Sequence, residues 1–424
     1  MRTLLVLIFI SVLLVSCTST KVEKTIVGER IMKADTMNYK DYWTSLVVYA
    51  PEKAIKLAPT PEHKELAEVW ASFMGNKRDS MEPKLLNLYR NTKNDTIRDY
   101  AGFFLFNLYS FNNDNKSILK NLRKSGETDS IMMVQYPTAC YADSAQTSVD
   151  FSSQPVTLKM NVRKGSAFVR IKINGMEKEL LFDTGCQMTM LSDKLAKELN
   201  IQSTTTNLSV LSSVGNNNSS KLTMLKNVEM GKSHISNLPI GVVPASAFNF
   251  KFWFISLAKF DGIIGWDIIK NFDVTIDCQK NIIILRQPYL KPKSDPNFVW
   301  LSDPLVKMKA ENGTEIIGMF DTGSDRTDGA LNLLGKLHTP DELSTKTSKR
   351  IWGIGGSKKL KGYRVKFIDL YSGNTKIHFK NIKVFDKSGL SNSAFMFTDV
   401  CIGFDIIKNG RVHFDISNGI FELE

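Results

Sequence analysis

The chain has 424 residues, of which 42% are hydrophobic and 10% aromatic, and it carries a formal net charge of +12. This length suffices for two or three packed domains, and the aromatic content excludes wholesale disorder. The positive charge either favours anionic surroundings, such as lipid headgroups or acidic substrates, or serves only solubility. The absence of a long basic run argues against nucleic-acid binding, and five histidines without close pairs argue against a histidine metal site or a Ser/His triad, so we expect no cofactor and no metal.

Residues 1–17 have the features of a targeting signal. A charged start at Arg2 precedes an apolar stretch, Leu4 to Val15, that is too short to span a bilayer as a helix. The stretch ends in Leu-Val-Ser-Cys, which resembles the lipobox of bacterial lipoproteins and implies lipidation of Cys17. An ordinary signal peptide that happens to contain a cysteine is the alternative. The lipid would anchor the protein in the bacterial cell envelope, and we expect the outer membrane, on its periplasmic or surface face.

Residues 18–150 are expected to form a helical domain. Helical periodicity runs from about 35 to 125, and apolar residues recur there at a spacing of 34. The matched pairs are Ala67 and Ala101, Trp70 and Phe104, Leu85 and Leu119, and Leu88 and Leu122. This period resembles tetratricopeptide-like helix pairs, but the recognised signature is incomplete, and a plain helical bundle is the alternative. The domain would serve as a spacer or bind a protein partner.

The rest of the chain contains an internal repeat. Asp183-Thr184-Gly185 recurs as Asp321-Thr322-Gly323, at an offset of 138 in the numbering (321 minus 183). The segment 261–277 recurs at the same offset as 399–415, with ten of seventeen positions identical. Self-similarity at a fixed offset indicates duplicated structure. We therefore predict two copies of one lobe, at 155–288 and 298–424, joined by a linker that contains Pro288, Pro292 and Pro296.

Each copy has the pattern of a mainly β lobe. Short β-rich runs such as 167–173 and 180–182 alternate with turn signals, including Asn174-Gly175 and Asn312-Gly313, which suit type I′ hairpins. One helix is expected after each Asp-Thr-Gly, with Ser192 as the N-cap of the first. The helical spacing comes from Leu191, Leu195 and Leu199 in the first copy and from Leu333 and Leu337 in the second. The predicted fold class is mainly β, with two lobes related by a pseudo-twofold axis and preceded by a small α-helical domain.

Both Asp-Thr-Gly motifs follow an apolar run that ends in Phe and precede an apolar-Ile-Gly motif about eighty residues on. With these parts, residues 155–424 resemble the pepsin-like and retropepsin-like aspartic peptidases, and the small lobes are nearer to the retropepsin-like type. The resemblance implies that Asp183 and Asp321 bind and activate the attacking water. It also implies that Thr184 and Thr322 cross-link the two loops through hydrogen bonds. Gly185 and Gly323 would let neighbouring amides approach the carboxylates, and Gly265 and Gly403 would pack beneath the loops.

The chemistry explains why two aspartates are needed. Peptide hydrolysis requires a water to lose a proton while the carbonyl oxygen gains one, and one carboxylate with one carboxylic acid can do both. Two carboxyl groups about 3 Å apart cannot both ionise, so they share a proton. Each lobe supplies one aspartate at the interface, which is why the duplication is required. Which aspartate holds the proton stays open at this point.

Two stretches occupy the place of the β-hairpin flap that closes over substrate in this clan, 212–221 and 351–359. Their glycines suit a mobile hairpin, and the candidate flap residues are Gly215, Trp352 and Gly353. Trp352 either covers the pocket or packs on the surface.

Some features depart from the family pattern. Cys186 follows the first motif where Ser or Ala is usual, and no histidine pattern supports it as a nucleophile. The aromatic run 248–254 has no close counterpart in the second copy and is either a pocket wall or buried packing. Asp325 and Asp328 lie near the second motif, where they would disturb the proton balance of the pair. Besides Cys17, the cysteines are too widely spaced to reveal a pairing: Cys140, Cys186, Cys278 and Cys401.

The function implied is that of an aspartic-type endopeptidase acting on peptide or protein substrates. The main alternative is a lipoprotein that keeps the bilobal fold and binds peptides, or serves as a scaffold, without turnover. Loss of either aspartate would have been its signature, and both are present. A second alternative is a structural surface protein that interacts through its helical region.

Overall fold

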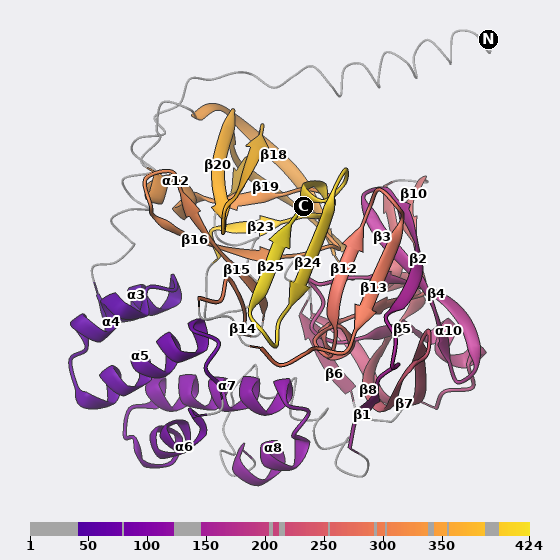
Figure 1. Cartoon of the computed structure of the whole chain (residues 1–424), viewed down its shortest axis with the longest axis horizontal. Coiled ribbons are helices and arrows are strands. Elements are labelled where there is room, and N and C mark those ends of the chain that lie inside the picture. The colour runs from indigo at the N-terminus through magenta and orange to yellow at the C-terminus, as the bar shows by residue number, and fades with distance from the viewer. Residues whose placement is uncertain are drawn as a thin grey trace.

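The structure is a computed structural model (Figure 1) that describes residues 41–122 and 146–424, with gaps at 79, 203–206, 212–216, 253–254, 292–294, 302, 338–342, 354–355 and 386–397. Cys17, with the predicted signal peptide, and Cys140 lie outside the described residues. Within the described part, no helix is both long and apolar enough to cross a membrane. The predicted fold class is confirmed, because a mainly β part of the chain follows a set of N-terminal helices.

The helices of the N-terminal region are α3 (Tyr42–Val47), α4 (Pro51–Leu57), α5 (Pro61–Met74), α6 (Glu82–Asn91), α7 (Asp95–Phe111) and α8 (Asn115–Leu122). Local sequence explains where several of them begin. Thr60 accepts a hydrogen bond from the amide of His63 and is followed by Pro61, whose missing N–H costs nothing at a helix start. Asn94 caps α7 in the same way, by accepting from the amide of Ile97.

The apolar spacing found in the sequence matches α5 with α7 and α6 with α8. Trp70 on α5 and Phe104 on α7 are wholly buried, and their ring centroids lie 5.0 Å apart. Leu85 and Leu88 on α6 are buried as well. The matched residues are therefore core positions of two consecutive helix pairs, which a tetratricopeptide-like region and a plain bundle would both show. The tetratricopeptide-like assignment stays a prediction.

The first lobe is built mainly from one extended sheet. Its strands are β1 (Ser148–Asp150), β2 (Val156–Arg163), β3 (Ser166–Ile173), β4 (Met176–Phe182), β5 (Met190–Ser192), β6 (Asn207–Leu211), β7 (Asn217–Met230), β8 (Ser233–Val243), β11 (Gly262–Ile264), β12 (Asp273–Asp277) and β13 (Ile282–Arg286), while β9 (Asn249–Phe252) pairs with β10 (Ile255–Lys259). Alternate residues of β2 are buried, as expected of a strand with one solvated face. Residues 148–150 were expected in the helical domain, but β1 pairs with β8, so the lobe begins earlier than predicted.

The second lobe has a separate sheet and two strands that join the first lobe. Its strands are β14 (Phe298–Leu301), β15 (Asp303–Ala310), β16 (Glu315–Phe320), β17 (Asp328–Ala330), β18 (Leu343–Gly353), β19 (Gly356–Val365), β20 (Phe367–Ser372), β21 (Thr375–Lys380), β22 (Lys383–Phe385), β23 (Val400–Ile402), β24 (Arg411–Asp415) and β25 (Ile420–Leu423). The helix predicted after each Asp-Thr-Gly is present, as α10 (Asp193–Glu198) and α12 (Leu331–Leu337). Ser192 caps α10 as predicted, because its Oγ accepts from the amide of Leu195 at 3.0 Å.

The two Asn-Gly turns differ from each other. Asn174 and Gly175 have φ angles of 50° and 81°, and positive values at both positions are what a type I′ turn requires. The prediction was wrong for Asn312-Gly313. There Asn312 does not have a positive φ, and its Oδ1 accepts a hydrogen bond from the amide of Thr314 at 3.0 Å. The strand pairing stops at Lys309 and Glu315, which leaves a longer loop than a two-residue turn.

The lobes meet in a shared sheet with the order β25-β24-β12-β13-β2 (Figure 1). β12 of the first lobe pairs antiparallel with β24 of the second, and Thr275 on β12 faces His413 on β24. His413 is also the counterpart of Thr275 at the repeat offset. A residue that faces its own counterpart lies on the pseudo-twofold axis. The axis therefore passes through this sheet, and main-chain hydrogen bonds join the lobes there.

The helical region shares a hydrophobic core with the second lobe. Four apolar residues on β14, β15 and β16 are buried in the same cluster as the helix residues: Val299, Leu301, Leu305 and Ile317. Asn76 also donates to the carbonyl of Ser417, 3.2 Å away. Toward the first lobe, Nζ of Lys270 donates to the carbonyls of Ser110 and Phe111 at the end of α7. The helical region thus contacts both lobes.

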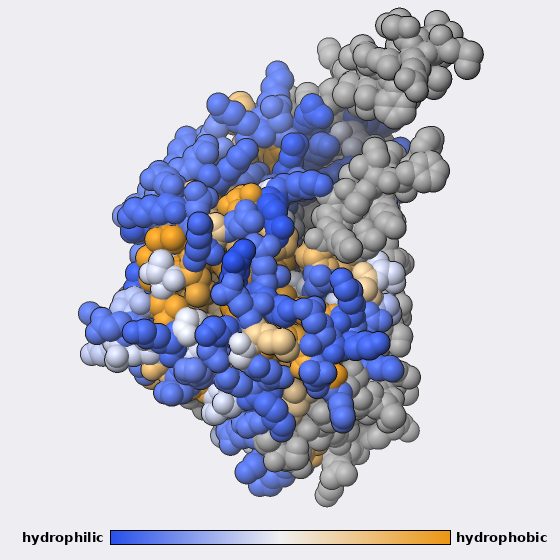
Figure 2. Space-filling model, turned by 90° about the vertical axis from the view of Figure 1, so that its right-hand side faces the viewer, coloured by the Kyte–Doolittle hydropathy of each residue, from blue (hydrophilic) through white to orange (hydrophobic). Residues whose placement is uncertain are grey.

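The described surface is largely hydrophilic. Figure 2 shows the side that lies to the right in Figure 1, where apolar side chains gather between hydrophilic ones. The most exposed large apolar residues are Tyr289 and Leu290 in the linker between the lobes, at 82% and 76% exposure. The linker backbone is nevertheless held, because Asn418 accepts from the amide of Lys291 and donates to the carbonyl of Tyr289.

Candidate active site

The two Asp-Thr-Gly loops follow equivalent core strands. Asp183 comes directly after β4, which runs parallel to β11, and its amide donates to the carbonyl of Ile264 at 3.1 Å. Asp321 comes directly after β16, which runs parallel to β23, and its amide donates to the carbonyl of Ile402 at 2.9 Å. The apolar run before each motif buries these strands, so each aspartate leaves a rigid element at a fixed point.

Thr184 and Thr322 are completely buried and cross-link the two loops. The amide of Thr184 donates to Oγ1 of Thr322 at 3.0 Å, and the amide of Thr322 donates to Oγ1 of Thr184 at 2.9 Å. Each hydroxyl in turn donates to a carbonyl of the opposite lobe, Thr184 to Phe320 and Thr322 to Phe182, both at 2.8 Å. Buried hydroxyl groups need partners, and here each threonine satisfies the other. The four bonds fix the loops against each other.

Gly185 and Gly323 allow the two carboxyl groups to approach. A Cβ on Gly185 would lie 2.5 Å from Cγ of Asp321, and a Cβ on Gly323 would lie 2.5 Å from Oδ1 of Asp183. Each aspartate therefore lies against the glycine of the opposite loop, where only glycine leaves room. The fold thus brings Asp183 and Asp321, which are distant along the chain, into mutual hydrogen-bonding contact. We call these two residues the dyad.

Burial and mutual contact raise the pKa of both carboxyl groups. Burial raises the pKa of Asp183 well above its usual value, and the charge of Asp321 raises it further. Burial also raises the pKa of Asp321, but the hydrogen bond with Asp183 and those donated by the amides of Gly323 and Ser324 oppose this rise. The arrangement therefore favours one proton shared by the two carboxyl groups.

A further layer of hydrogen bonds supports each loop and was missed from the sequence. Oγ1 of Thr189 donates to Oδ1 of Asp267 at 2.6 Å and accepts from the amide of Gly265 at 3.1 Å. The second lobe repeats this arrangement with the counterparts of these residues at the repeat offset: Thr327, Asp405 and Gly403. A Cβ on Gly265 would lie 2.6 Å from the main-chain carbon of Met188, so this glycine packs beneath the loop. The repeat offset itself was the signal that could have identified the threonine and aspartate pairs.

A third carboxyl group near the dyad was also missed. Asp303, at the start of β15, is buried and hydrogen-bonds to the side chain of Gln187 in the opposite lobe. Burial raises the pKa of Asp303 to about 7, and the charge of Asp321 contributes to the rise. The symmetry-related contact joins Gly165 and Asp325, since a Cβ on Gly165 would lie 2.9 Å from Cβ of Asp325. No motif marks Asp303, because its contact depends on how the lobes meet.

A β-hairpin occupies each predicted flap position. β6 pairs with β7, and β18 pairs with β19 up to Gly353 and Gly356. The backbone of Trp352 lies in the second hairpin opposite Ser357, whereas its side chain is outside the description. Gly215 lies outside the described residues. The roles of these residues as flaps stay predictions.

The acidic residues after the second motif are partly neutralised. Nζ of Lys349 on β18 lies 2.5 Å from Oδ2 of Asp328 and 4.0 Å from Oδ1 of Asp325.

The first residue of the aromatic run 248–254 is part of the core of the first lobe. Phe248 is wholly buried in a small cluster with Phe168 and Met190, so it serves packing. The side chains of the rest of the aromatic run, 249–254, are outside the description.

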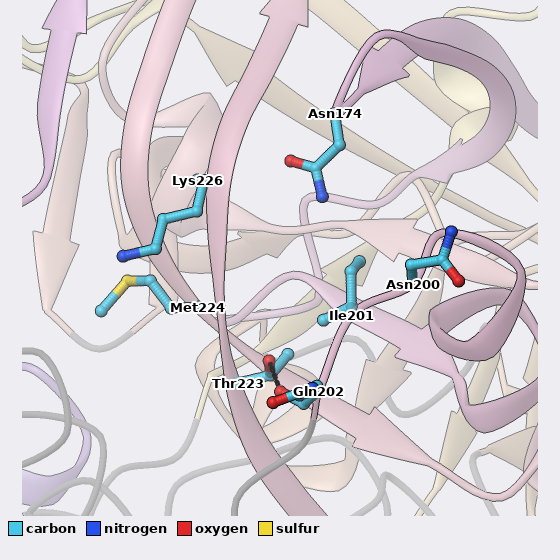
Figure 3. A pocket seen from close by; sticks show the side chains of 7 residues that line it. All are labelled: Asn174, Asn200, Ile201, Gln202, Thr223, Met224 and Lys226. Atoms are coloured by element: carbon cyan, nitrogen blue, oxygen red, sulfur yellow. Dashed lines mark hydrogen bonds between the residues drawn. The ribbon is translucent and has the colours of Figure 1, made fainter.

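A hollow on the first lobe is lined by residues from the β3–β4 turn, the end of α10 and β7 (Figure 3). Its lining residues are Asn174, Asn200, Ile201, Gln202, Thr223, Met224 and Lys226. Oγ1 of Thr223 donates to the carbonyl of Gln202 at 2.6 Å. The lining contains neither member of the dyad, nor any other carboxylate or histidine.

The family model described as aspartyl protease matches residues 169–268, which run from β3 into α11 (Trp266–Ile269) and contain the first Asp-Thr-Gly loop. These residues are therefore similar to the aspartyl proteases, in agreement with the resemblance found in the sequence.

Other comparisons add little to this assignment. No curated protein matches the sequence. Among solved structures, a retropepsin-like aspartic protease from Rickettsia conorii is 18% identical, over 33% of this chain and 94% of that chain, with a TM-score of 0.22. The assignment rests on the family match and on the geometry of the dyad.

Proposed function

We propose that the chain is an aspartic-type endopeptidase in which Asp183 and Asp321 together activate one water molecule for attack on a peptide carbonyl. The observation that carries this proposal is the approach of the two carboxyl groups, each held against the glycine of the opposite loop. One ionised and one protonated carboxyl group so close together can act as base and acid in one step.

We take Asp321 as the base and Asp183 as the acid, which gives the path of the protons. Asp321 takes a proton from the water as its oxygen attacks the carbonyl carbon, and Asp183 gives its proton to the carbonyl oxygen. The tetrahedral diol then returns a hydroxyl proton to Asp183 while Asp321 protonates the departing nitrogen, and the C–N bond breaks. The dyad ends as it began. Because activity needs one proton on the pair, the raised pKa of Asp183 extends the alkaline limit of activity upward from the usual carboxyl range.

Edge strands offer a place for an extended peptide. β6 ends the sheet of the first lobe and β18 ends the sheet of the second, so each has an edge free of a further strand in the described chain. A peptide can add to such an edge through main-chain hydrogen bonds, and side-chain pockets then set its preference. This mode fits a peptide or protein substrate.

Digestion of a mixed peptide library tests the proposal. The intact chain is incubated with the library from acid to neutral pH, and products are identified by mass spectrometry. Asp183→Asn and Asp321→Asn should each lower the cleavage rate by roughly 10²–10⁴-fold, because each removes one proton-transfer group. Asp150→Asn, on the exposed strand β1, is the matched control. Unchanged cleavage in either dyad variant would exclude the mechanism, and peptide binding without cleavage at any pH would favour the non-catalytic alternative.

We also propose that a lipid on Cys17 anchors the protein in the bacterial envelope. The support is the sequence Leu-Val-Ser-Cys after a short apolar stretch. In a bacterial host, Cys17→Ser should prevent labelling by a fatty-acid analogue and move the protein out of the membrane fraction. Labelling that survives the substitution would leave only the ordinary signal peptide.

A further inference from the structure

One thiol next to the dyad breaks the symmetry between the lobes. Cys401 lies on β23, within the second apolar-Ile-Gly motif, and its Sγ lies 3.7 Å from Oδ2 of Asp321. Its repeat counterpart in the first lobe is Ile263. An isoleucine has no group to donate, so the position that offers a donor to Asp321 offers none to Asp183.

The environment of Cys401 keeps its thiol protonated. The residue is only 7% exposed. Burial raises the pKa of the thiol well above its usual value, and the adjacent charge of Asp321 raises it further. A protonated thiol beside a carboxylate acts as a weak donor. The contact is therefore a hydrogen bond from Sγ to Oδ2.

The other hydrogen bonds of the dyad leave this oxygen to the thiol. Oδ1 of Asp321 accepts from the amides of Gly323, at 2.9 Å, and Ser324, at 3.1 Å. Oδ1 of Asp183 accepts from the amide of Gly185 at 2.8 Å, and the amide of Gly323 also hydrogen-bonds to this carboxyl group. Both carboxyl groups thus have main-chain donors, and the thiol adds a side-chain donor to Asp321.

We propose that Cys401 is a positioning residue of the dyad, whose thiol stabilises the carboxylate form of Asp321 and so keeps the shared proton on Asp183. This inference rests on the proposed function and deepens it. It gives each lobe a fixed role, with the base in the second lobe and the acid in the first.

The charged groups of the second lobe near the thiol are already paired. Asp328 lies opposite Cys401 in the antiparallel register of β17 and β23, but its carboxylate forms the ion pair with Lys349 at 2.5 Å. Lys349 also lies 4.0 Å from Asp325. The ion pairs of Lys349 are thus with these two carboxylates, whereas the thiol of Cys401 hydrogen-bonds to Oδ2 of Asp321.

The groups that face the dyad from elsewhere have other partners. The thiol of Cys186 donates to the carbonyl of Met188 at 3.0 Å, so it does not compensate Asp183 in the way that Cys401 compensates Asp321. Asp303 hydrogen-bonds to Gln187, and its charge, when present, opposes ionisation of Asp321. Because burial raises the pKa of Asp303 to about 7, its titration has to be separated from the effect of the thiol in any test.

Four variants of the intact chain test the inference. Cys401→Ala and Cys401→Val remove the donor, Cys401→Ser restores one, and Cys278→Ser removes a half-buried thiol outside the dyad loops. The readouts are the pH profile of kcat/KM and the carboxyl ¹³C NMR titration of the dyad, each repeated with Asp303→Asn to remove its titration. We expect Cys401→Ala and Cys401→Val to move the acid limb and the lower dyad pKa up by roughly half to one pH unit. Cys401→Ser and Cys278→Ser should stay close to the wild type.

The outcomes separate the inference from the proposed function. An acid limb that stays in place in both Cys401→Ala and Cys401→Val, or an equal loss of kcat at every pH, would overturn the inference and leave the thiol a packing role. The NMR titration does not require turnover. If the chain cleaves no peptide, these two variants can still show an increase in the lower of the two dyad pKa values. That result would support the inference about the proton and would reject only the peptidase proposal.

Discussion

The two lobes hold their Asp-Thr-Gly loops with the same threonine hydrogen bonds but surround the aspartates with different side chains. Beside Asp183, Met190 on β5 faces Ile263 on β11. Beside Asp321, the repeat counterparts of these two residues face each other in the same register, Asp328 on β17 and Cys401 on β23. An apolar pair in one lobe thus corresponds to a polar pair in the other. One duplicated scaffold therefore places its two carboxyl groups in different surroundings, because the backbone sets the geometry and the neighbouring side chains set the polarity.

The lobes also differ in what covers them. The second lobe buries apolar residues of β14, β15 and β16 against the helical region. The first lobe meets the helices through Lys270, which is buried and donates to α7, whereas its counterpart Lys408 is exposed. The contact of the second lobe is mainly apolar, and that of the first is a polar tether. The second lobe should therefore depend more strongly on the helices.

Deletion of the chain before residue 123 should have the largest effect. It would expose Val299, Leu301, Leu305 and Ile317, and burying each such side chain is worth about 1.5–3 kcal/mol, so the loss approaches the whole stability of a typical domain. We expect an insoluble or unfolded product by circular dichroism. The control is Lys270→Met in the full chain, which cuts the tether to the first lobe and should stay folded. A soluble, cooperatively folding deletion product would contradict this dependence.

The next largest effect tests the part that the lobes share. Gly185→Ala and Gly323→Ala each place a methyl group against the aspartate of the opposite loop. Both should lower peptide cleavage by at least roughly 10²-fold, because displacement of a catalytic group by about 1 Å costs that much. Gly75→Ala is the control, since a Cβ there would meet its nearest neighbours at 3.4 Å. Tolerance of alanine at one glycine alone would show that the dyad is less symmetric than its hydrogen bonds suggest.

A smaller effect should separate the lobes. Lys336, with 7% of its side chain exposed, pairs with the buried Asp399 at 2.7 Å, while its counterpart Glu198 forms an exposed pair with Lys178. Lys336→Met leaves a buried carboxylate without its cation and should lower the free energy of unfolding by about 3 kcal/mol. Glu198→Gln should cause no measurable change. Urea unfolding of both variants makes the comparison, and Asp399→Asn should partly rescue Lys336→Met. Equal changes in the free energy of unfolding in Lys336→Met and Glu198→Gln would contradict this difference between the lobes.

The fixed repeat offset made the centre of the site predictable. Asp183 and Thr184 recur with their neighbours as a short motif, and two copies of one lobe must place such motifs symmetrically about an axis. Thr189 and Asp267 recur at the same offset, but Thr189 lies 78 positions before Asp267, outside the repeated segment 261–277. Their pairing becomes visible only when the strands bring them together.

Contacts that depend on how elements meet were beyond prediction. Cys401 reaches Asp321, which is distant in the chain, because β16 and β23 run parallel with Met319 beside Cys401. The Asn312-Gly313 turn departs from its counterpart although the dipeptide is the same. There the pairing of β15 with β16 ends earlier, so the strands determine the turn. Local sequence thus predicted the elements, and their register determined the chemistry between them.

The smallest expected effect lies on the axis itself, where the lobes differ in one titratable residue. His413 of the second lobe faces Thr275 of the first, and its Nε2 lies 3.0 Å from Oδ1 of Asp273. This hydrogen bond raises the pKa of His413. A histidine whose pKa is raised on folding contributes its full stability below the unfolded pKa of about 6.5, and loses it as pH rises through the folded value.

His413→Thr makes the two lobes alike at this position. We expect it to lower the free energy of unfolding by roughly 0.5 kcal/mol below pH 6, where the half-exposed setting already screens the interaction, and by less above the raised pKa. Urea unfolding of both proteins at several pH values measures the difference. In an Asp273→Asn background the pH dependence should shrink but persist in part, because Glu422, 3.5 Å from Nδ1 of His413, also raises the pKa of the histidine. A difference that stays constant with pH would mean that the histidine joins the lobes by packing. If instead the difference in free energy of unfolding becomes smaller as the pH rises, then His413, and so the second lobe, is the source of the pH dependence at this junction.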